Sequence, residues 1–445
     1  MFGNESVLVQ TIQYSDTVKQ ALQALFGGSA SGSDALLFAG NDSPFSRPSR
    51  IVLADSSSRT ARSLAAKGYQ FTHRFALLPS KESTRWLVPR NEEFQIVNGL
   101  EMYPSFSIRA TVYKSFASRM AAMGWPGWSG NSIWVASKEP FPIEKLVEEI
   151  TGETRPQFAL SLGTAGASRK LTVQVMRQGG EILGYIKLPL TERANDRIRA
   201  EARTLAKLYE NLRLRAYVPA VLYASQWDGG HLLFQTPIMG DPGPARLTSL
   251  HEQALNAMHS ERSELKPGEQ VVAAVGKKCS SLLKKLGAKW SALIEDALRA
   301  AAHELRGTQV RCGLGHGDFT PWNTRLRAKK LCLVDWEMAS WDVPLVWDKF
   351  HFLAQIQSLL RQGDGPDSLT DFTNEKRALY ILYLLHSAAY LAEDGPQSFD
   401  IAYREAQLRK QLQALCSMAS ATQPLRFEER ALVSDDLNAS GACEK

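Results

Sequence analysis

Cysteines, long apolar runs and internal repeats are scarce or missing in this sequence of 445 residues. Its five cysteines are scattered without a C-x-x-C pair, which gives no support for a zinc site or a disulfide framework. No window approaches the roughly 18 consecutive apolar residues that a membrane-spanning helix needs. The N-terminal segment MFGNESVLVQ lacks a basic stretch followed by an apolar one, so no secretory signal is expected. The sequence therefore predicts a cytoplasmic protein without a membrane span.

The excess of one charge sign is also small. The net charge is +6, and basic residues come in short pairs such as Lys277-Lys278 and Lys284-Lys285, not in a long block. Such pairs are typical of solvated helix faces, so no nucleic-acid partner is predicted. Apolar residues make up 44% of the chain and charged residues 22%, which is ordinary for a globular protein of two or three domains.

The first 152 residues have a pattern of their own. Short apolar runs predict strands, and amphipathic segments predict helices, in the order strand 35–39, strand 50–54, helix 58–67, strand 71–78 and helix 142–150. This order predicts a small α/β domain of unknown role over residues 1–152, which faintly resembles a degraded Rossmann-like region. No G-x-G-x-x-G motif follows a strand there, so this domain has no mark of nucleotide binding.

Beyond residue 152 the pattern changes to strands around glycine turns and then to helices. Strands are predicted over residues 158–162, 171–176, 182–188 and 231–236, with a long helix over residues 195–212. The chain after residue 243 is mainly helical, apart from short strands such as residues 331–334. These patterns predict an α+β fold with a β-sheet lobe (153–240), a helical lobe (241–422) and a flexible tail (423–445).

The segment 314–339 carries the most chemistry, and it reads LGHGDFTPWNTRLRAKKLCLVDWEMA. Asp318 and Asn323 have Asp-x-x-x-x-Asn spacing, and Asp335 follows a short apolar strand. Phosphoryl transfer needs a carboxylate that accepts the proton of the attacking hydroxyl, and oxygen ligands that hold a metal against the phosphates. Taken singly, Asp318 could be a turn or cap residue, Asn323 could close a turn, and Asp335 could simply end a strand.

Two motifs in this segment resemble those of aminoglycoside phosphotransferases and choline kinases: HGD at 316–318 followed by Asn323, and VDWE at 334–337. The resemblance implies a bilobal, protein-kinase-like fold that uses ATP and Mg2+. It implies that Asp318 is the catalytic base and that Asn323 and Asp335 hold Mg2+. His316 would brace the catalytic loop.

The same resemblance implies a nucleotide-binding lobe upstream. Gly163 and Gly166 stand between two apolar runs, where backbone N–H groups can approach phosphate oxygens. Taken alone, an ordinary hairpin turn is the better explanation of these two glycines.

A lysine that holds the phosphates is expected on a strand of this lobe, and a glutamate on the next helix should fix it. Lys187 stands among apolar residues, where an unpaired ammonium group would be costly. Glu201 is its expected partner, with Glu192 and Glu210 as rivals on the same helix.

The run LLFQTPIMG at 232–240 is expected to end the last strand of the lobe and to bind the adenine edge. Gln235 and Met239 are the candidate contacts, although a methionine there could equally belong to the core. Asp348 resembles the aspartate that accepts hydrogen bonds from the catalytic loop backbone. His259 is expected to be structural.

These patterns predict an enzyme that transfers the γ-phosphoryl group of ATP to a hydroxyl of a small molecule, such as a sugar, an amino alcohol or an aminoglycoside-like compound. The alternative is a pseudokinase, which binds nucleotide without turnover. A third hypothesis places the chemistry in the N-terminal domain, where no nucleophile or cofactor motif is present. Acidic residues in the helical lobe would indicate an amine acceptor, but none cluster in the sequence. The sequence does not indicate the oligomeric state.

Overall fold

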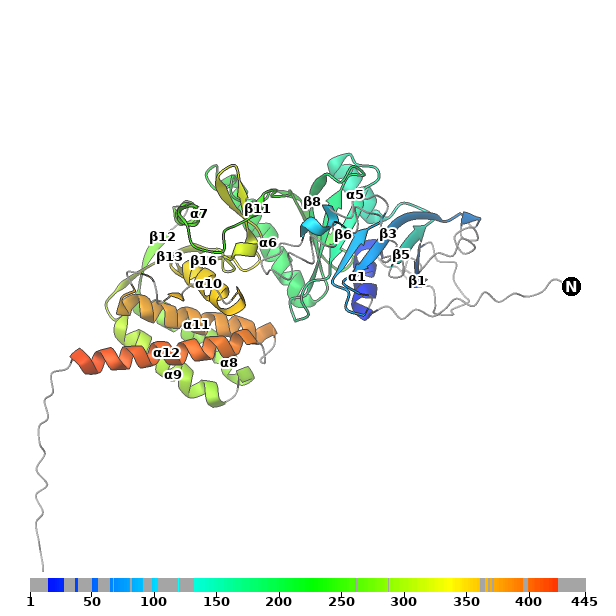
Figure 1. The fold of residues 1–445 in the computed structure, drawn as a ribbon. Helices are drawn as coiled ribbons and strands as arrows, with labels where there is room; N and C mark the ends of the chain where they lie inside the picture. Colours follow the sequence, from blue (N-terminus) through cyan, green and yellow to red (C-terminus); the bar gives the residue numbers. More distant parts are fainter. Residues whose placement is uncertain are drawn as a thin grey trace, which may run out of the picture.

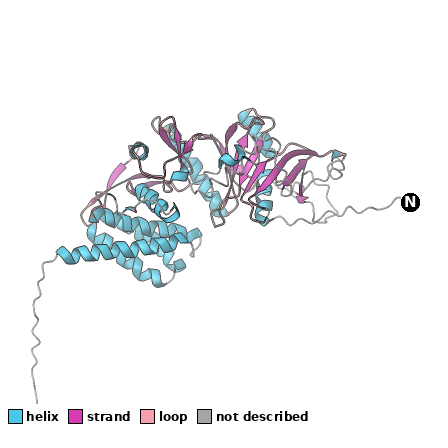
Figure 2. Cartoon of the chain, in the orientation of Figure 1, coloured by secondary structure: helices cyan, strands magenta, loops and turns pink. Residues whose placement is uncertain are grey.

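The computed structural model describes residues 15–27, 37–38, 50–54, 65–66, 68–80, 82–90, 98–102, 119, 132–260, 263–286, 288–360, 365–366, 369, 372–394 and 399–422. Within these residues, most strands gather in one half of the molecule and most helices in the other (Figure 2). The tail expected over residues 423–445, and most of the helix expected over residues 58–67, lie outside the described residues.

Ten strands form one sheet, in the order β1-β2-β5-β3-β4-β6-β7-β8-β10-β9. The pair β1–β2 is parallel and every other neighbouring pair is antiparallel. Their bounds are β1 Leu37–Phe38, β2 Arg50–Ala54, β3 Gln70–Leu78, β4 Trp86–Pro89, β5 Ser132–Ser137, β6 Gln157–Ser161, β7 Lys170–Met176, β8 Ile182–Pro189, β9 Val221–Trp227 and β10 Gly230–Gln235.

The sheet crosses residue 152, where the sequence predicts a boundary between two domains. Strand β4 pairs with β6, and Leu87 lies opposite Leu160 in this pairing, with both side chains buried. Pairing satisfies backbone N–H and C=O groups that two separate sheet edges would leave open. The N-terminal strands therefore extend the sheet of the predicted nucleotide lobe, and the division at residue 152 stays a prediction.

Two helices cover one face of this sheet and bind its parts together. Helix α1 (Asp16–Phe26) begins after Ser15, whose hydroxyl accepts a hydrogen bond from the backbone of Val18, and helix α5 covers Pro142–Thr151. Phe26 of α1 contacts Phe75 of β3 and Phe158 of β6, with ring centroids 6.2 and 6.0 Å apart. One apolar core thus serves strands on both sides of residue 152. The sequence analysis did not predict α1.

Helix α6 (Glu192–Glu210) packs against β8 and β10 near the junction of the two halves (Figure 1). Its N-cap is Thr191, whose hydroxyl accepts a hydrogen bond from the backbone of Ala194 at 3.2 Å. Ile198 and Leu205 are fully buried on the face that meets the sheet, which is the amphipathic pattern of a helix covering a core. Glu201 lies on this same buried face.

The second half is mainly helical, with two small three-stranded sheets. Its elements are β11 Asp241–Pro242, α7 Ser249–His259, β12 Ser263–Pro267, α8 Gly268–Leu286, α9 Ala288–Glu304, β13 Gln309–Gly315, the 3-10 turn η3 Pro321–Asn323, β14 Thr324–Arg327, β15 Lys330–Leu333, β16 Ser340–Pro344, α10 Trp347–Gln355, the π-helical turn η4 Ile356–Leu360, α11 Asn374–Asp394 and α12 Phe399–Thr422. The hairpin β14–β15 carries the segment between Asn323 and Asp335.

Helices α8, α9, α11 and α12 pack around a core of their own. Residues 378–385 of α11 are buried almost without interruption, as expected for a helix enclosed by neighbours on several sides. Among the described residues, no helix is both long enough and apolar enough to cross a membrane. An antiparallel sheet lobe followed by a helical lobe is the bilobal α+β architecture that the sequence predicts.

Candidate active site

Lys187 and Glu201 form a buried ion pair between β8 and α6. The Lys187 Nζ atom lies 2.6 Å from Oε1 and 2.7 Å from Oε2 of Glu201. Lys187 is 5% exposed and Glu201 is fully buried. Two charges this far from water persist only when they are closely paired. Glu201 is therefore the partner that Lys187 requires, as the sequence predicts over its rivals Glu192 and Glu210.

Asp335, two residues after the end of β15, is a second carboxylate in contact with Lys187. Its Oδ1 atom lies 2.8 Å from the Nζ of Lys187 and 2.7 Å from the Nζ of Lys170. Its backbone has φ of +68°, a conformation uncommon outside glycine, which holds the carboxylate at the junction of the lobes. Burial opposes its ionisation, but the two ammonium groups outweigh burial and lower the pKa of Asp335 below its usual range.

Lys170 and Glu337 belong to the same cluster. Glu337 is part of the VDWE motif, where the sequence leaves open whether it assists a metal or only hydrogen-bonds locally, whereas Lys170 was not predicted as a site residue. The Lys170 Nζ atom also contacts Oε2 of Glu337, and Arg197 lies 3.6 Å from Oε1 of Glu337. Burial alone would lower the pKa of Lys170, yet the carboxylates of Asp335 and Glu337 raise it above its usual value. Lys170 is the first residue of β7, directly after the turn that contains Gly163 and Gly166. A lysine at this position was the sequence signal that could have identified it as a site residue.

Asp348 of α10 holds the loop that begins at His316 through two hydrogen bonds. Its Oδ2 accepts a hydrogen bond from the His316 backbone at 2.8 Å, and its Oδ1 accepts one from the Gly317 backbone at 3.0 Å. Gly317 has φ of +80°, and a Cβ there would lie 2.3 Å from the carbonyl oxygen of Met338. Only glycine fits this turn. The bracing role predicted for Asp348 is confirmed.

His316 is fully buried and joins the loop to the segment 334–337. Its Nε2 atom lies 3.1 Å from the carbonyl oxygen of Val334, and its Nδ1 accepts a hydrogen bond from the Asp318 backbone at 3.3 Å. Burial lowers the pKa of His316, which favours a neutral ring that donates to Val334 and accepts from Asp318. These contacts are those of a positioning residue.

Asp318 is held by hydrogen bonds on both carboxylate oxygens. Asn323 Nδ2 donates to Oδ2 at 2.7 Å, and His351 Nε2 lies 2.9 Å from Oδ1. Burial would raise the pKa of Asp318, but the hydrogen bond from His351 and the charges of His351 and His316 together outweigh burial and lower it. His351 itself contacts the hydroxyl of Tyr383 at 3.1 Å. The sequence analysis missed His351, which lies one helical turn after Asp348 on α10.

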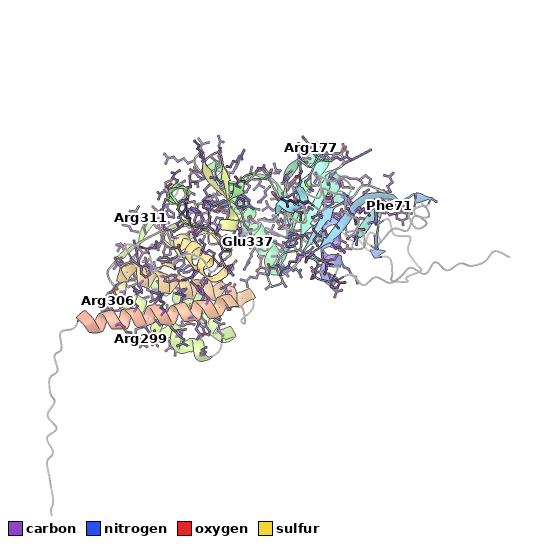
Figure 3. The ribbon with its side chains drawn as sticks, viewed as in Figure 1. Phe71, Arg177, Arg299, Arg306, Arg311 and Glu337 are labelled. Atoms are coloured by element: carbon purple, nitrogen blue, oxygen red, sulfur yellow. The ribbon has the colours of Figure 1, made fainter. Side chains whose placement is uncertain are left out.

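Two cavities meet at this loop. The first has a volume of about 240 Å3 and is lined by Met102, Ser161, Lys170, Thr172, Tyr185, Lys187, Gln235, Thr236, Ile238, Trp322, Asn323, Arg325, Val334 and Asp335. The second has a volume of about 370 Å3, and Asp318, Glu337 and His351 contribute to its lining. In Figure 3, Glu337 is labelled where the strand-rich and helical halves meet.

The first cavity has features that suit a nucleotide. Two ammonium groups, those of Lys170 and Lys187, lie on its wall for phosphates. The buried Oε1 atom of Gln235 has no hydrogen-bond partner among the described residues, so it can accept one from a bound base. Met239 is 47% exposed, and its neighbour Ile238 lines the cavity. Gly163 and Gly166 lie in the turn between β6 and β7 and do not line it.

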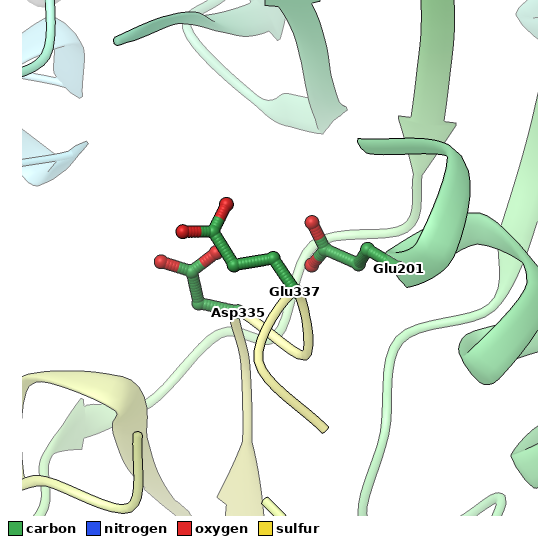
Figure 4. Close-up of side chains that lie close together, drawn as sticks. All are labelled: Glu201, Asp335 and Glu337. Atoms are coloured by element: carbon green, nitrogen blue, oxygen red, sulfur yellow. The ribbon is translucent and has the colours of Figure 1, made fainter. Parts of the chain in front are cut away.

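Three carboxylates come close enough together to hold a cation. Oxygen atoms of Glu201, Asp335 and Glu337 lie within 4.8 Å of one another (Figure 4). Both carboxylate oxygens of Glu201 accept hydrogen bonds from Lys187. Asp335 contacts Lys170 and Lys187 through Oδ1 alone. Asp335 and Asn323 both line the first cavity, and carboxylate and amide oxygens are hard donors of the kind that suits Mg2+.

The bilobal fold and this site agree with the kinase-like arrangement that the sequence motifs imply. Residues 177–346 match the family model of the phosphotransferase enzyme family, known as APH. The matched stretch contains both motifs and the pair Lys187–Glu201, so the resemblance drawn from the sequence is confirmed. Comparison with curated protein sequences gives no match.

Several solved structures are similar to this chain. A thermostable mutant of aminoglycoside phosphotransferase APH(4)-Ia is 15% identical, covers 61% of this chain and 98% of its own, and has a TM-score of 0.45. Aminoglycoside 2'-phosphotransferase-IIIa in its GDP complex is 14% identical over 61% and 97%, with a TM-score of 0.39. A choline/ethanolamine kinase family protein from Mesorhizobium loti is 16% identical over 57% and 87%, with a TM-score of 0.36. At such low identities and scores, these structures say nothing about the substrate of this chain.

We expect Lys187→Met to lower the free energy of unfolding by about 3–5 kcal/mol, because it leaves the buried carboxylate of Glu201 without its partner. The double variant Lys187→Met/Glu201→Gln should recover most of this loss, since the amide still accepts the hydrogen bond from the Trp336 backbone. Urea unfolding followed by tryptophan fluorescence measures both. A double variant as unstable as the single one would contradict the pairing, and recovery of ADP formation with stability would show that Lys187 is only structural.

We expect His351→Leu to move the acidic limb of the pH profile of kcat/KM upward by about one pH unit. The pKa of Asp318 is lowered in the folded protein, so its ionised form is present above that pKa and is lost as the pH falls through it. Removing the His351 contact raises this pKa, and the loss then begins at a higher pH. His303→Leu on the exposed surface of α9 is the matched control. An unchanged acidic limb in His351→Leu would show that His351 does not hold the proton state of Asp318.

Proposed function

We propose that this protein transfers the γ-phosphoryl group of ATP to a hydroxyl group of a small molecule, with Mg2+ as its cofactor. The observation that carries this proposal is the 2.7 Å hydrogen bond between Asn323 and Asp318. Asn323 lines the cavity with the two lysines, and Asp318 lines the second cavity. A phosphate donor and a hydroxyl acceptor held in the two cavities would thus meet at one loop.

The donor side is built to neutralise phosphate charge. Lys187 is fixed by Glu201, and Lys170 lies on the same wall, so two ammonium groups face a bound triphosphate. Asp335 and Asn323 would hold Mg2+, which supplies further positive charge against the phosphate oxygens. Fixed charges of this kind lower the barrier because they need no rearrangement as the reaction proceeds.

The acceptor side supplies the base. The acceptor hydroxyl oxygen forms a bond to the γ-phosphorus, and the bond between this phosphorus and the oxygen bridging it to the β-phosphate breaks. The hydroxyl proton passes to Asp318, and ADP leaves with the bridging oxygen. The lowered pKa of Asp318 keeps it ionised and ready to accept this proton near neutral pH. His351 and Asn323 fix its carboxylate in position.

ADP formation tests the proposal. Purified protein is incubated with ATP and Mg2+, alone and with sugars, sugar acids, amino alcohols and aminoglycosides, and Mg2+-dependent ATP binding is measured by calorimetry in parallel. The proposal predicts ADP formation that one class of acceptor stimulates and that chelation of Mg2+ abolishes. Mg2+-dependent binding without ADP formation for any acceptor favours the pseudokinase alternative. No binding of ATP would contradict both.

A further inference from the structure

Two cationic side chains, those of Lys278 and Arg404, line the second cavity beside one face of helix α11. Helix α11 turns one face toward the cavity, with Tyr383, His386, Ser387 and Tyr390 in its lining. These residues are spaced as neighbours on one side of a helix. Lys278 of α8 and Arg404 of α12 line the cavity beside this face. The cavity volume of about 370 Å3 is in the range that small-molecule ligands fill.

Each carboxylate that lines this cavity already has hydrogen-bond or ion-pair partners. Asp318 accepts hydrogen bonds from Asn323 and His351, and Asp348 accepts two from the catalytic loop backbone. The remaining carboxylate, Glu337, contacts Lys170 and Arg197. Among the described lining residues, no further carboxylate is left to bind an amino group of an acceptor.

Arg404 differs from these carboxylates, because it is a buried cation for which the described residues provide no ion pair. Its side chain is fully buried, and its Nε donates to the hydroxyl of Ser387 at 2.9 Å. Its Nη1 has no hydrogen-bond partner among the described residues. The rings of Tyr403 and Tyr383, at 5.2 and 5.9 Å, attract the guanidinium weakly. A buried guanidinium is costly unless an anion compensates it.

Lys278 adds a second cation to the same wall. Its Nζ lies 3.2 Å from Nε2 of His386. Burial, together with the charge of Lys278, lowers the pKa of His386 to about 3, so His386 is neutral and accepts this hydrogen bond. Burial lowers the pKa of Lys278, and the charge of Glu393 opposes this effect. The wall formed by α8, α11 and α12 is therefore suited to an anion.

We propose that the acceptor is an anionic hydroxyl compound whose carboxylate or phosphate group is bound by Arg404 and Lys278 while its hydroxyl faces Asp318. This inference rests on the proposed phosphotransferase function. It excludes polycationic aminoglycosides as preferred substrates, because an amino group on this wall would meet two cations. Arg404 is thus a specificity-determining residue, whose guanidinium can bind a carboxylate or phosphate through two parallel hydrogen bonds.

Acceptors with related carbon skeletons and different charge test this proposal. Glycerate, gluconate and glucuronate, together with glycerol 3-phosphate and glucose 6-phosphate, are compared with neutral glycerol, sorbitol and glucose and with cationic serinol, glucosamine and kanamycin. We expect an anionic member to have kcat/KM at least about 10-fold above its neutral and cationic counterparts. The carboxylate and phosphate arms distinguish the two sources of the anion. A neutral or cationic acceptor used as well as its anionic counterpart would overturn the proposal.

The variant Arg404→Gln provides a second test of the anionic-acceptor proposal. It should lower kcat/KM for the anionic acceptor by about 30-fold or more, mainly through KM, as for a truncated buried charge pair. The KM for ATP and the kcat/KM for the neutral counterpart should change less than about threefold, and Arg404→Lys should recover part of the loss. Arg409→Gln, on the exposed face of the same helix, is the control. Equal losses for all acceptors would assign Arg404 a structural role only.

The remaining outcomes separate this inference from the proposed function. If Arg404→Gln does not fold, Lys278→Gln takes its place with the same expected loss for the anionic acceptor alone. If the wild type binds Mg2+ and ATP but uses no member of the panel, the anionic-acceptor inference is rejected and nucleotide binding stands. If the wild type does not bind ATP, the proposed function itself fails.

Discussion

Asp318→Asn should bind ATP and Mg2+ as tightly as the wild type and transfer the phosphoryl group about 10²–10⁴-fold more slowly, the usual contribution of a positioned base. The amide keeps nearly the same shape and volume, so the loop should keep its fold. It cannot take up the hydroxyl proton, and His351 loses the charge that it contacts at 2.9 Å. Binding by calorimetry and product formation in a single turnover measure the two effects separately.

Asp296→Asn is the matched control for this variant, because Asp296 is an exposed residue of α9 far from the loop in sequence. It should bind and turn over like the wild type. Transfer by Asp318→Asn within about threefold of the wild-type rate would remove Asp318 from the chemistry. Loss of nucleotide binding together with turnover would show that Asp318 acts on the donor side instead.

Asp335→Asn is expected to lower kcat by about 10²–10³-fold, because it removes the charged oxygen donor that faces the nucleotide cavity. It should also lower the free energy of unfolding by about 3 kcal/mol, since Lys170 and Lys187 then lie near the same atom without a shared carboxylate. The Mg2+ concentration needed for half-maximal ATP binding should rise. Calorimetric titration with Mg2+ and urea unfolding measure these effects.

The exposed Asp342, which pairs with Lys266 on the surface, provides the control substitution Asp342→Asn. Loss of stability in Asp335→Asn without a change in the Mg2+ requirement would mean that Asp335 only neutralises the lysines. An unchanged stability would contradict the buried contacts described for Lys170 and Lys187.

The sequence predicts the parts of the site that follow from local order along the chain. The loop from His316 to Asn323 and the strand that ends at Asp335 are contiguous, so their spacing limits where each side chain can lie. The pair of Lys187 and Glu201 follows from a similar argument, because a buried lysine on a strand needs a carboxylate on the helix that covers it. Only Glu201 among the candidates is fully buried on that helix face.

The missed residues depend on contacts between distant elements. Lys170 joins the site because β7 lies beside β8 in the sheet, and a short sequence motif does not record this pairing. His351 reaches Asp318 because α10 packs beneath the loop, and Arg404 reaches the second cavity from the last helix. Such contacts follow from tertiary packing, which single-sequence periodicity does not encode.

The N-terminal region also has a role in the site that its sequence does not indicate. The turn η1 (Leu100–Met102) packs onto the sheet, and Met102 lines the first cavity. Asn98 just before it donates a hydrogen bond to the carbonyl of Gly180 and accepts one from Gln174, at 2.9 and 2.7 Å. The region before residue 152 thus shares both a sheet and a cavity wall with the predicted nucleotide lobe. A motif search could not find this because a methionine carries no signature of nucleotide binding.

The central claim is that the chain moves the γ-phosphoryl group of ATP to a small-molecule hydroxyl, and phosphorus NMR of the reaction tests it most directly. Wild-type protein is incubated with ATP, Mg2+ and the best acceptor of the charge-matched panel. If the γ-phosphoryl group is transferred to the acceptor, we expect a new phosphomonoester resonance that grows as the γ-phosphate resonance declines. ADP should form in equal amount. Inorganic phosphate as the sole product, or unchanged ATP despite Mg2+-dependent binding, would contradict it.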